Sequence, residues 1–162
     1  MPARASRISA PGCADPLRRP LLRFRPATEA DFDALVDLSI RVMREHLERL
    51  GRFNPERRRN RMRAHFDAGG LRVIEHDGQP IGCIGLEPGE RAVELHSLFL
   101  EPSQQGRGLG ASAFALARAT HPGCAFRIEV LKGSPARCFW ERQGFVLTGE
   151  QPFDWVMERA AD

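Results

Sequence analysis

The chain contains no tyrosine, and Lys132 is its one lysine among 24 basic residues. No apolar run reaches the roughly 18 residues that a membrane-spanning helix needs, and the N-terminus lacks the apolar core of a signal peptide. The cysteines form no Cys-x-x-Cys pair and have no histidine at zinc-site spacing. These absences predict a cytoplasmic protein with no membrane contact and no metal, and with free thiols at Cys13, Cys83, Cys124 and Cys138.

Excess positive charge is confined to one end of the sequence. The formal net charge is +3, and residues 1–20 supply it with four arginines against Asp15 alone. The remaining 142 residues carry 20 basic and 20 acidic side chains. A nucleic-acid-binding domain concentrates its basic excess on the folded surface, so no nucleic-acid partner is expected. Proline content and low hydrophobicity predict a disordered basic tail over residues 1–20, before a single domain over residues 21–162.

Glycines occupy three alternate positions in the middle of the chain: Gly106, Gly108 and Gly110. Apolar residues between Val93 and Leu100 predict a strand that Pro102 ends, and an alanine-rich run from 111 to 119 predicts a helix. The glycines therefore precede a helix, where backbone N–H groups are unpaired and the helix dipole is positive. This arrangement predicts a site for a phosphate or pyrophosphate.

Two phosphate-binding loops fit this segment poorly. A Walker loop requires a lysine directly after its last glycine, and the segment has none. The dinucleotide-binding fingerprint matches the spacing of Gly106, Gly108 and Ala111. In that fingerprint, however, the first glycine follows its strand directly, whereas residues 101–105 intervene here. Only 31 residues follow position 131, too few for the rest of a doubly wound sheet.

Two segments together resemble the GNAT N-acetyltransferases. The first, Gln105-Gly106-Arg107-Gly108-Leu109-Gly110, matches the acetyl-CoA loop of that family, Gln/Arg-x-x-Gly-x-Gly/Ala. The second, from Val130 to Phe145, is similar to the family's strand followed by Asn-Pro-Ala-Arg-x-Phe-Tyr-Glu-Arg-x-Gly-Phe. Ser134 stands in place of the asparagine and Trp140 in place of the tyrosine. Both motifs in this order favour the GNAT family over the other phosphate-binding loops.

The resemblance implies an α+β fold in three layers. In the GNAT fold a mixed, mostly antiparallel twisted sheet of about seven strands is flanked by about four helices, and its central strands splay apart. Hydrophobic periodicity predicts the matching order β-α-α-β-β-β-α-β-α-β-β. Thr28 and Asp31 predict the start of the first helix, Asn54 that of the second, and Asp77-Gly78 a hairpin turn.

The resemblance also implies how acetyl-CoA binds as co-substrate. Its pantetheine arm would pair with the splayed strands, and a backbone N–H near Leu98 would stabilise the oxyanion of the reaction. The implied cofactor-binding residues are Leu98, Phe99, Leu100, Gln105, Gly106, Arg107, Gly108, Leu109, Gly110, Ala111, Ser134, Phe139, Trp140 and Arg142.

Acetyl transfer to an amine requires a group that removes a proton from the acceptor ammonium. Glu94 falls where histone-type members of the family carry their general-base glutamate. His96 lies on the same strand face and has the more suitable unperturbed pKa, so both remain candidates. The indole of Trp140 cannot replace the family's general-acid tyrosine, because it releases no proton at useful pH. Ser134, Cys138 or a water molecule would then protonate the leaving thiolate.

The resemblance thus implies an N-acetyltransferase that passes the acetyl group to a primary amine of a small molecule or peptide, as a monomer or homodimer. The missing tyrosine leaves a second function open, an acyl-CoA-binding sensor or scaffold with weak turnover. Five arginines between Arg57 and Arg63 have two interpretations, recruitment of an anionic acceptor or a solvated helix face.

Overall fold

The computed structural model describes residues 21–162, so the predicted disordered tail at 1–20 lies outside the described residues. The elements are β1 (Leu22–Pro26), α1 (Glu29–Arg49), α2 (Pro55–Asp67), β2 (Leu71–His76), β3 (Gln79–Pro88), β4 (Val93–Leu100), a 3-10 turn (Pro102–Gln104), α3 (Leu109–Thr120), β5 (Phe126–Leu131), α4 (Ala136–Arg142), β6 (Val146–Glu150) and β7 (Asp154–Arg159). This is the order that the sequence predicted.

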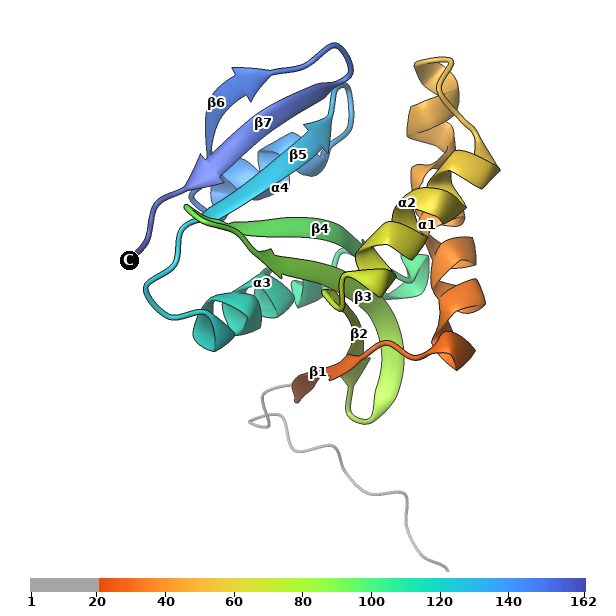
Figure 1. Ribbon diagram of the computed structural model, residues 1–162, viewed down its shortest axis with the longest axis horizontal. Helices are drawn as coiled ribbons and strands as arrows, with labels where there is room; N and C mark the ends of the chain where they lie inside the picture. The colour runs from red at the N-terminus through yellow and green to blue at the C-terminus, as the bar shows by residue number, and fades with distance from the viewer. Residues whose placement is uncertain (1–20) are drawn as a thin grey trace, which may run out of the picture.

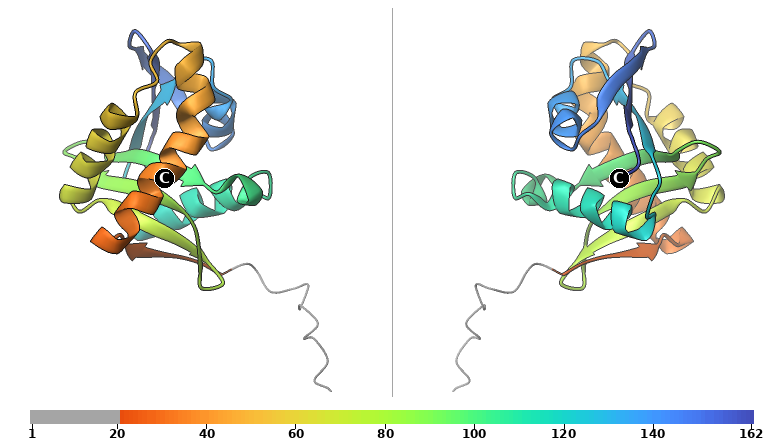
Figure 2. Two further views of the ribbon diagram at one scale, coloured as in Figure 1. Left: turned by 90° about the vertical axis from the view of Figure 1, so that its right-hand side faces the viewer. Right: turned by 90° about the vertical axis from the view of Figure 1, so that its left-hand side faces the viewer.

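The strands form one seven-stranded sheet in the order β1-β2-β3-β4-β5-β7-β6. Every neighbouring pair is antiparallel except β4 and β5, which are parallel. The four helices cover the two faces, with α1 and α2 on one side and α3 and α4 on the other (Figures 1 and 2). The predicted fold class, a mostly antiparallel sheet flanked by helices, is confirmed.

Each face of the sheet has its own hydrophobic core. Phe32 of α1 and Met62 of α2 lie in the first core. Phe114 of α3 and Trp140 of α4 lie in the second, with ring centroids 5.5 Å apart. The amphipathic helices are therefore held by apolar burial on opposite faces, and the strands between them are fixed from both sides.

The two central strands part half-way along their length. Parallel pairing joins β4 and β5 only from Val93↔Phe126 to Leu95↔Ile128. Beyond Leu95 the β4 strand contains a bulge, because its pairing with β3 passes from Gly85↔His96 to Cys83↔Phe99 and Ser97 has φ +54°. A bulge redirects the side chains that follow it. The predicted splay is confirmed, and it leaves the ends of both strands with unpaired backbone edges.

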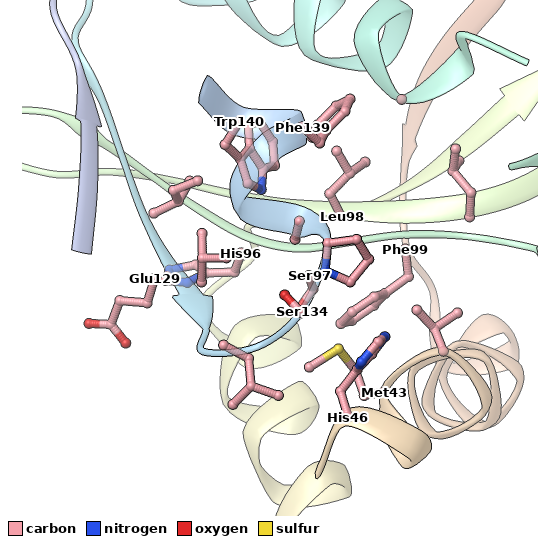
Figure 3. Close-up of a pocket in the computed structure, with 18 of the residues that line it drawn as sticks. Met43, His46, His96, Ser97, Leu98, Phe99, Glu129, Ser134, Phe139 and Trp140 are labelled. Carbon is pink, nitrogen blue, oxygen red and sulfur yellow. The ribbon is translucent and has the colours of Figure 1, made fainter. Parts of the chain in front are cut away.

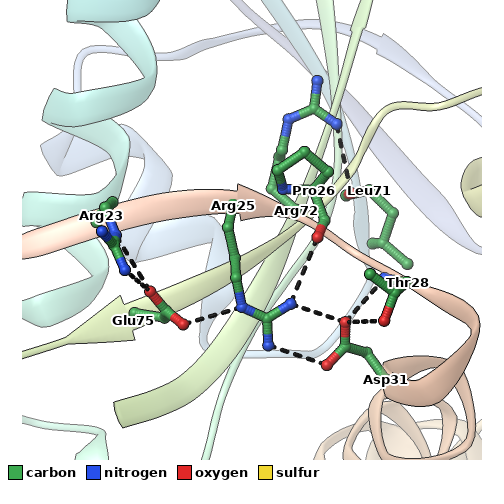
Figure 4. A network of polar contacts seen from close by, with 8 residues as sticks. All are labelled: Arg23, Arg25, Pro26, Thr28, Asp31, Leu71, Arg72 and Glu75. Carbon is green, nitrogen blue, oxygen red and sulfur yellow. Dashed lines mark hydrogen bonds and ion pairs between the residues drawn. The ribbon is translucent and has the colours of Figure 1, made fainter. Parts of the chain in front are cut away.

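An ion-pair network fastens the start of α1 to the edge of the sheet (Figure 4). Glu75 of β2 accepts from Arg23 at 2.7 Å and from Arg25 at 2.9 Å. Arg25 also binds both carboxylate oxygens of Asp31, at 2.8 and 2.9 Å. Asp31 further accepts from the backbone N–H and the hydroxyl of Thr28, at 2.8 and 2.9 Å. The predicted helix start is confirmed, and one carboxylate both caps the helix and joins it to β1.

We expect Asp31→Asn to lower stability at neutral pH and to reduce the further loss of stability in acid. Hydrogen bonds from Arg25, and then from Thr28, hold the pKa of Asp31 well below its usual value. A carboxylate with a lowered pKa stabilises the folded state above the unfolded-state pKa, and this contribution is lost as pH falls below about 4. The measurement is the unfolding midpoint from pH 7 to pH 3, with exposed Asp37→Asn as control. Identical pH profiles for Asp31→Asn and wild type would contradict the assignment.

Three cysteines in the described part of the chain are free, as predicted: Cys83 is buried, and Cys124 and Cys138 are exposed. Cys13 lies outside the described residues. Over residues 21–162, no helix combines the length and the apolar character needed to span a bilayer.

Candidate active site

A cleft of about 1020 Å³ lies where β4 and β5 diverge. Its walls are α1 and α2 on one side, the end of β4, the glycine loop with the start of α3, the end of β5, and α4. Both sequence motifs therefore contribute to one concave surface. Its size is that of a site for a small molecule or cofactor.

Most of the predicted site residues line this cleft. They are His96, Leu98, Phe99, Leu100, Gln105, Gly106, Gly108, Gly110, Ala111, Ser134, Phe139, Trp140 and Arg142. Three others are not among the lining residues: Glu94, Arg107 and Leu109. The side chain of Leu109 is 4% exposed and packs in the core, and Arg107 turns outward to donate to Gln104 Oε1 at 2.8 Å.

The glycine loop presents backbone donors at the start of α3. Gly108 has φ +76°, and the first bond of the helix runs from Ser112 N to Gly108 O at 3.1 Å. The N–H groups of residues 109–111 therefore have no intrahelical acceptor. The side-chain amide of Gln105 donates to Leu100 O at 3.1 Å and so holds the loop against the end of β4. The positive end of the helix dipole and the free donors together form an anion site.

The three loop glycines serve different purposes. A Cβ atom at Gly106 or Gly108 would meet nothing within 4 Å, whereas one at Gly110 would lie 3.3 Å from the ring of Phe139. Gly106 and Gly108 keep space open and allow positive φ, at +71° and +76°. Gly110 instead allows α3 to pack against α4, a role that the sequence analysis did not assign to it.

Glu94 is held in an ion pair. Its Oε2 lies 3.0 Å from Arg127 Nη1, and Arg127 is the β5 residue in register with it. The carboxylate of Glu94, which was predicted as a candidate base, is therefore already paired with the guanidinium of Arg127. This ion pair lies where β4 and β5 are still hydrogen-bonded to each other.

His96 lies in the wall of the cleft (Figure 3), where burial and the neighbouring His65 favour its neutral form. Its ring stacks on that of His65 from α2, with centroids 4.1 Å apart and planes at 19°. Its Nε2 lies 3.7 Å from one oxygen of Glu87, whose other oxygen lies 3.0 Å from His65 Nδ1. Burial lowers the pKa of His96, and His65 lowers it further. A neutral imidazole facing the cleft can accept a proton.

The model of the acetyltransferase (GNAT) family matches residues 35–145, more than half of the chain. The chain belongs to the GNAT family. Comparison with curated protein sequences gave no match.

Solved structures with this fold include GNAT proteins at low sequence identity. The PaiA N-acetyltransferase of Thermoplasma acidophilum, in complex with coenzyme A, is 18% identical at a TM-score of 0.69, with 86% of this chain and 99% of that chain covered. A GNAT family acetyltransferase of Streptococcus agalactiae is 13% identical at 0.71, with 87% and 96% covered. The N-acetylglutamate synthase of Neisseria gonorrhoeae, complexed with coenzyme A and L-arginine, is 19% identical at 0.59, with 86% and 33% covered.

The structure shows how this GNAT chain departs from the family tyrosine. Trp140, which replaces it, is 6% exposed and packs edge-on against Phe114 and Phe145. Ser134 Oγ is buried, lines the cleft, and has no hydrogen-bond partner among the described residues (Figure 3). An unpaired hydroxyl in a cleft is free to donate to a bound group. Ser134 thus offers the cleft an unpaired hydrogen-bond donor, whereas the ring of Trp140 is packed against other aromatic rings.

His65, Glu87 and His96 offer ligand atoms that all lie within 4.8 Å of one another, which could hold a metal ion. An imidazole binds a metal at about 2.1 Å along the lone pair in its ring plane. Two nearly parallel rings 4.1 Å apart do not share such a point. As arranged, Glu87 is hydrogen-bonded to His65 and close enough to His96 for charge interaction, an arrangement that does not suit metal binding. The absence of a metal stays a prediction.

His65 and Glu87 were not predicted as site residues from the sequence, and the arginines between Arg57 and Arg63 were treated there as one group. In the structure this group splits by helix face. Arg59 and Arg63 turn to α1, where they pair with Asp33 and Glu29, each at 2.7 Å. Arg57, Arg58 and Arg61 line the cleft. Helical spacing of three and four residues was the signal that could have separated the two sets.

Proposed function

We propose that the protein is a cytoplasmic N-acetyltransferase that transfers the acetyl group of acetyl-CoA to a primary amine by direct attack. The observation that carries this proposal is one cleft with an anion-binding glycine loop and a base-competent imidazole, at the point where β4 and β5 part. The coenzyme A complexes of two proteins with this fold support it. We further propose that residues 21–162 act as one domain without a metal, as a monomer or homodimer.

The cofactor half of the cleft would hold coenzyme A through the backbone. Free N–H groups at the start of α3 suit the pyrophosphate, and the unpaired edges of β4 and β5 suit the amides of the pantetheine arm. Acetyl-CoA supplies an activated acyl group. A backbone N–H in the bulge near Leu98 would donate to the acyl oxygen as it gains negative charge.

We assign the proton-accepting role to His96 rather than Glu94. An amine with a pKa near 10 is mostly protonated at neutral pH, so a base must act before attack. His96 lines the cleft and has a lowered pKa that favours its neutral form, whereas Glu94 is bound to Arg127 and lies outside the lining. After proton transfer, the carboxylate of Glu87, 3.7 Å from His96 Nε2, would stabilise the imidazolium.

Ser134 is proposed to assist the leaving thiolate. A thiol with a pKa near 8.5 leaves with little help, so a hydrogen bond from a neutral hydroxyl suffices. The unpaired Oγ of Ser134 can make that bond. Full protonation then comes from solvent.

The buried Trp140 favours one alternative function. Because no ionisable acid stands at that position, the protein could bind acyl-CoA as a sensor or scaffold with weak turnover. Release of free thiol from acetyl-CoA over a panel of amines separates the two functions, since both bind the cofactor and only the enzyme releases thiol.

Acetyl-CoA is expected to raise the unfolding temperature, whereas NAD and ATP are not. The loop lacks a Walker lysine, and the sheet is not doubly wound. At a concentration 100 times the dissociation constant, binding adds about 2.7 kcal/mol of stability. Differential scanning fluorimetry with each nucleotide measures the effect, with free coenzyme A as positive control. Equal stabilisation by NAD would contradict the assignment of the glycine loop to coenzyme A.

A further inference from the structure

Arg58 of α2 lines the cleft and forms no ion pair with any carboxylate of residues 21–162. Its Nε is buried and has no hydrogen-bond partner among residues 21–162. Its guanidinium lies 5.5 Å from the centroid of the Phe99 ring. Burial, and then repulsion from Arg61, lowers the pKa of Arg58 to about 10, so the side chain is still charged at neutral pH.

A buried charge without a counter-ion is costly to the fold. The neighbouring Arg59 and Arg63 each have an acidic partner on α1, at 2.7 Å. Arg58 has no acidic partner among residues 21–162. Other arginines of the same helix do reach carboxylates on a neighbouring helix, so such partners are within reach of an arginine on α2. Destabilising features that persist in a cleft are typical of ligand binding.

The position of Arg58 separates it from the cofactor loop. α2 crosses β4 through three contacts: Arg58 over Phe99, Met62 Sδ with Ser97 Oγ at 3.5 Å, and His65 stacked on His96. The helix α2 lies on the face of the sheet opposite α3, whose N-terminus forms the anion site (Figure 2). The cleft thus has two places for anions, one for a pyrophosphate and one on the α2 side.

A second unpaired polar atom belongs to the same wall. His46 of α1 lines the cleft below Phe99 (Figure 3), and its Nδ1 is buried without a partner in the described structure. Arg58 and His65 are seven residues apart, which is about 10 Å along a helix axis. Arg58 is therefore displaced by roughly two helical turns from His65, and so from His96, on which His65 stacks.

We propose that Arg58 and His46 form a carboxylate-binding subsite for the acceptor, so that the acceptor is an amine carrying a carboxylate several bonds away. The guanidinium donates to the carboxylate oxygens, and His46 donates from Nδ1–H. That the acceptor amine lies at His96 rests on the proposed acetyl transfer. That the subsite binds a carboxylate does not, because binding can occur without turnover.

An NMR titration of the full chain decides the subsite independently of activity. The buried Arg58 Nε–H signal, assigned by its disappearance in Arg58→Lys, is followed while sodium acetate is added in the presence of saturating coenzyme A. We expect a saturable shift with acetate and none with acetamide, its neutral counterpart. No shift with acetate overturns the proposal, and a larger shift with inorganic phosphate overturns its assignment to a carboxylate.

A pair of acceptors tests the link to catalysis. We expect 6-aminohexanoate to exceed hexylamine in kcat/KM by roughly 10- to 100-fold, as charge-assisted hydrogen bonds contribute, and this ratio to fall toward one in Arg58→Met. The control is Arg59→Met, the same substitution on the side of α2 that pairs with α1, outside the cleft lining, and it should keep the ratio. Equal rates in wild type overturn the acceptor class. If neither amine releases thiol in wild type, acetyl transfer to such amines fails while the acetate titration still decides the subsite.

The unfolding temperature of Arg58→Met separates a binding role from a structural one. Removing an unpaired buried charge should leave that temperature unchanged or raise it. A clear fall in Arg58→Met, together with no acetate-dependent shift of the Arg58 Nε–H signal in wild type, would show that Arg58 only supports the fold.

Discussion

Replacement of His96 by glutamine is expected to lower kcat for acetyl transfer by roughly 10²- to 10⁴-fold, with little change in KM for acetyl-CoA. Glutamine keeps polar bulk in the cleft wall but cannot accept the proton of the acceptor ammonium. The substitution leaves the glycine loop unchanged, so the contacts proposed for the pyrophosphate stay available. Steady-state kinetics with a fixed amine, together with acetyl-CoA binding by calorimetry, measure both quantities.

The pH dependence of kcat distinguishes a catalytic role of His96 from a structural one, because a purely structural residue would not shift the pH profile. Burial and His65 lower the pKa of His96, so the neutral form that catalyses is already present below the usual value near 6.5. The base-dependent limb of the wild-type profile should therefore lie below pH 6.5. In His96→Gln that limb should vanish, and the residual rate should climb into the alkaline range as free amine accumulates.

Glu94→Gln is the matched control for His96→Gln. Glu94 is two residues away on the same strand, and its carboxylate is occupied by Arg127 at 3.0 Å. We expect this variant to retain most of the wild-type kcat. Loss of turnover in Glu94→Gln with near-normal turnover in His96→Gln would return the base to Glu94, where the family resemblance placed it.

The order of helices and strands could be predicted from local sequence patterns. The caps at Thr28–Asp31 and Asn54 are predictable because each helix start depends on residues within one turn. The glycine loop and Ser134 are readable for the same reason, since the motif and the local geometry coincide. The cleft lies where two strands of the sheet diverge, so its position is determined by the strand order. Short connections between consecutive elements restrict that order.

Contacts between distant segments could not be read in this way. The partner of Glu94 is Arg127, which depends on the parallel register of β4 and β5. Strand alternation gives the face of a side chain but not the charge that it meets there. The bulge at Ser97 likewise has no sequence signature that distinguishes it from a regular strand. His65 enters the site only because α2 lies across β4.

Gly108→Val is expected to abolish acetyl-CoA binding, so that the stabilisation of about 2.7 kcal/mol at 100 times the wild-type dissociation constant disappears. Gly108 has φ +76° and caps α3, and a branched side chain there would stand beside the free N–H groups that suit the pyrophosphate. The strained backbone alone costs about 1–2 kcal/mol, so some loss of the unfolding temperature is also expected. That loss must be separated from the loss of binding.

Gly123→Val supplies the separation. Gly123 has φ +72° with nothing within 4 Å of its Cβ position, and it lies in the turn between α3 and β5. It therefore carries the same strain as Gly108 but is not part of the cleft lining. We expect both variants to unfold at similar, lowered temperatures, and only Gly123→Val to be stabilised by acetyl-CoA. If Gly108→Val responds to acetyl-CoA as Gly123→Val does, the glycine serves the turn alone and the pyrophosphate binds elsewhere.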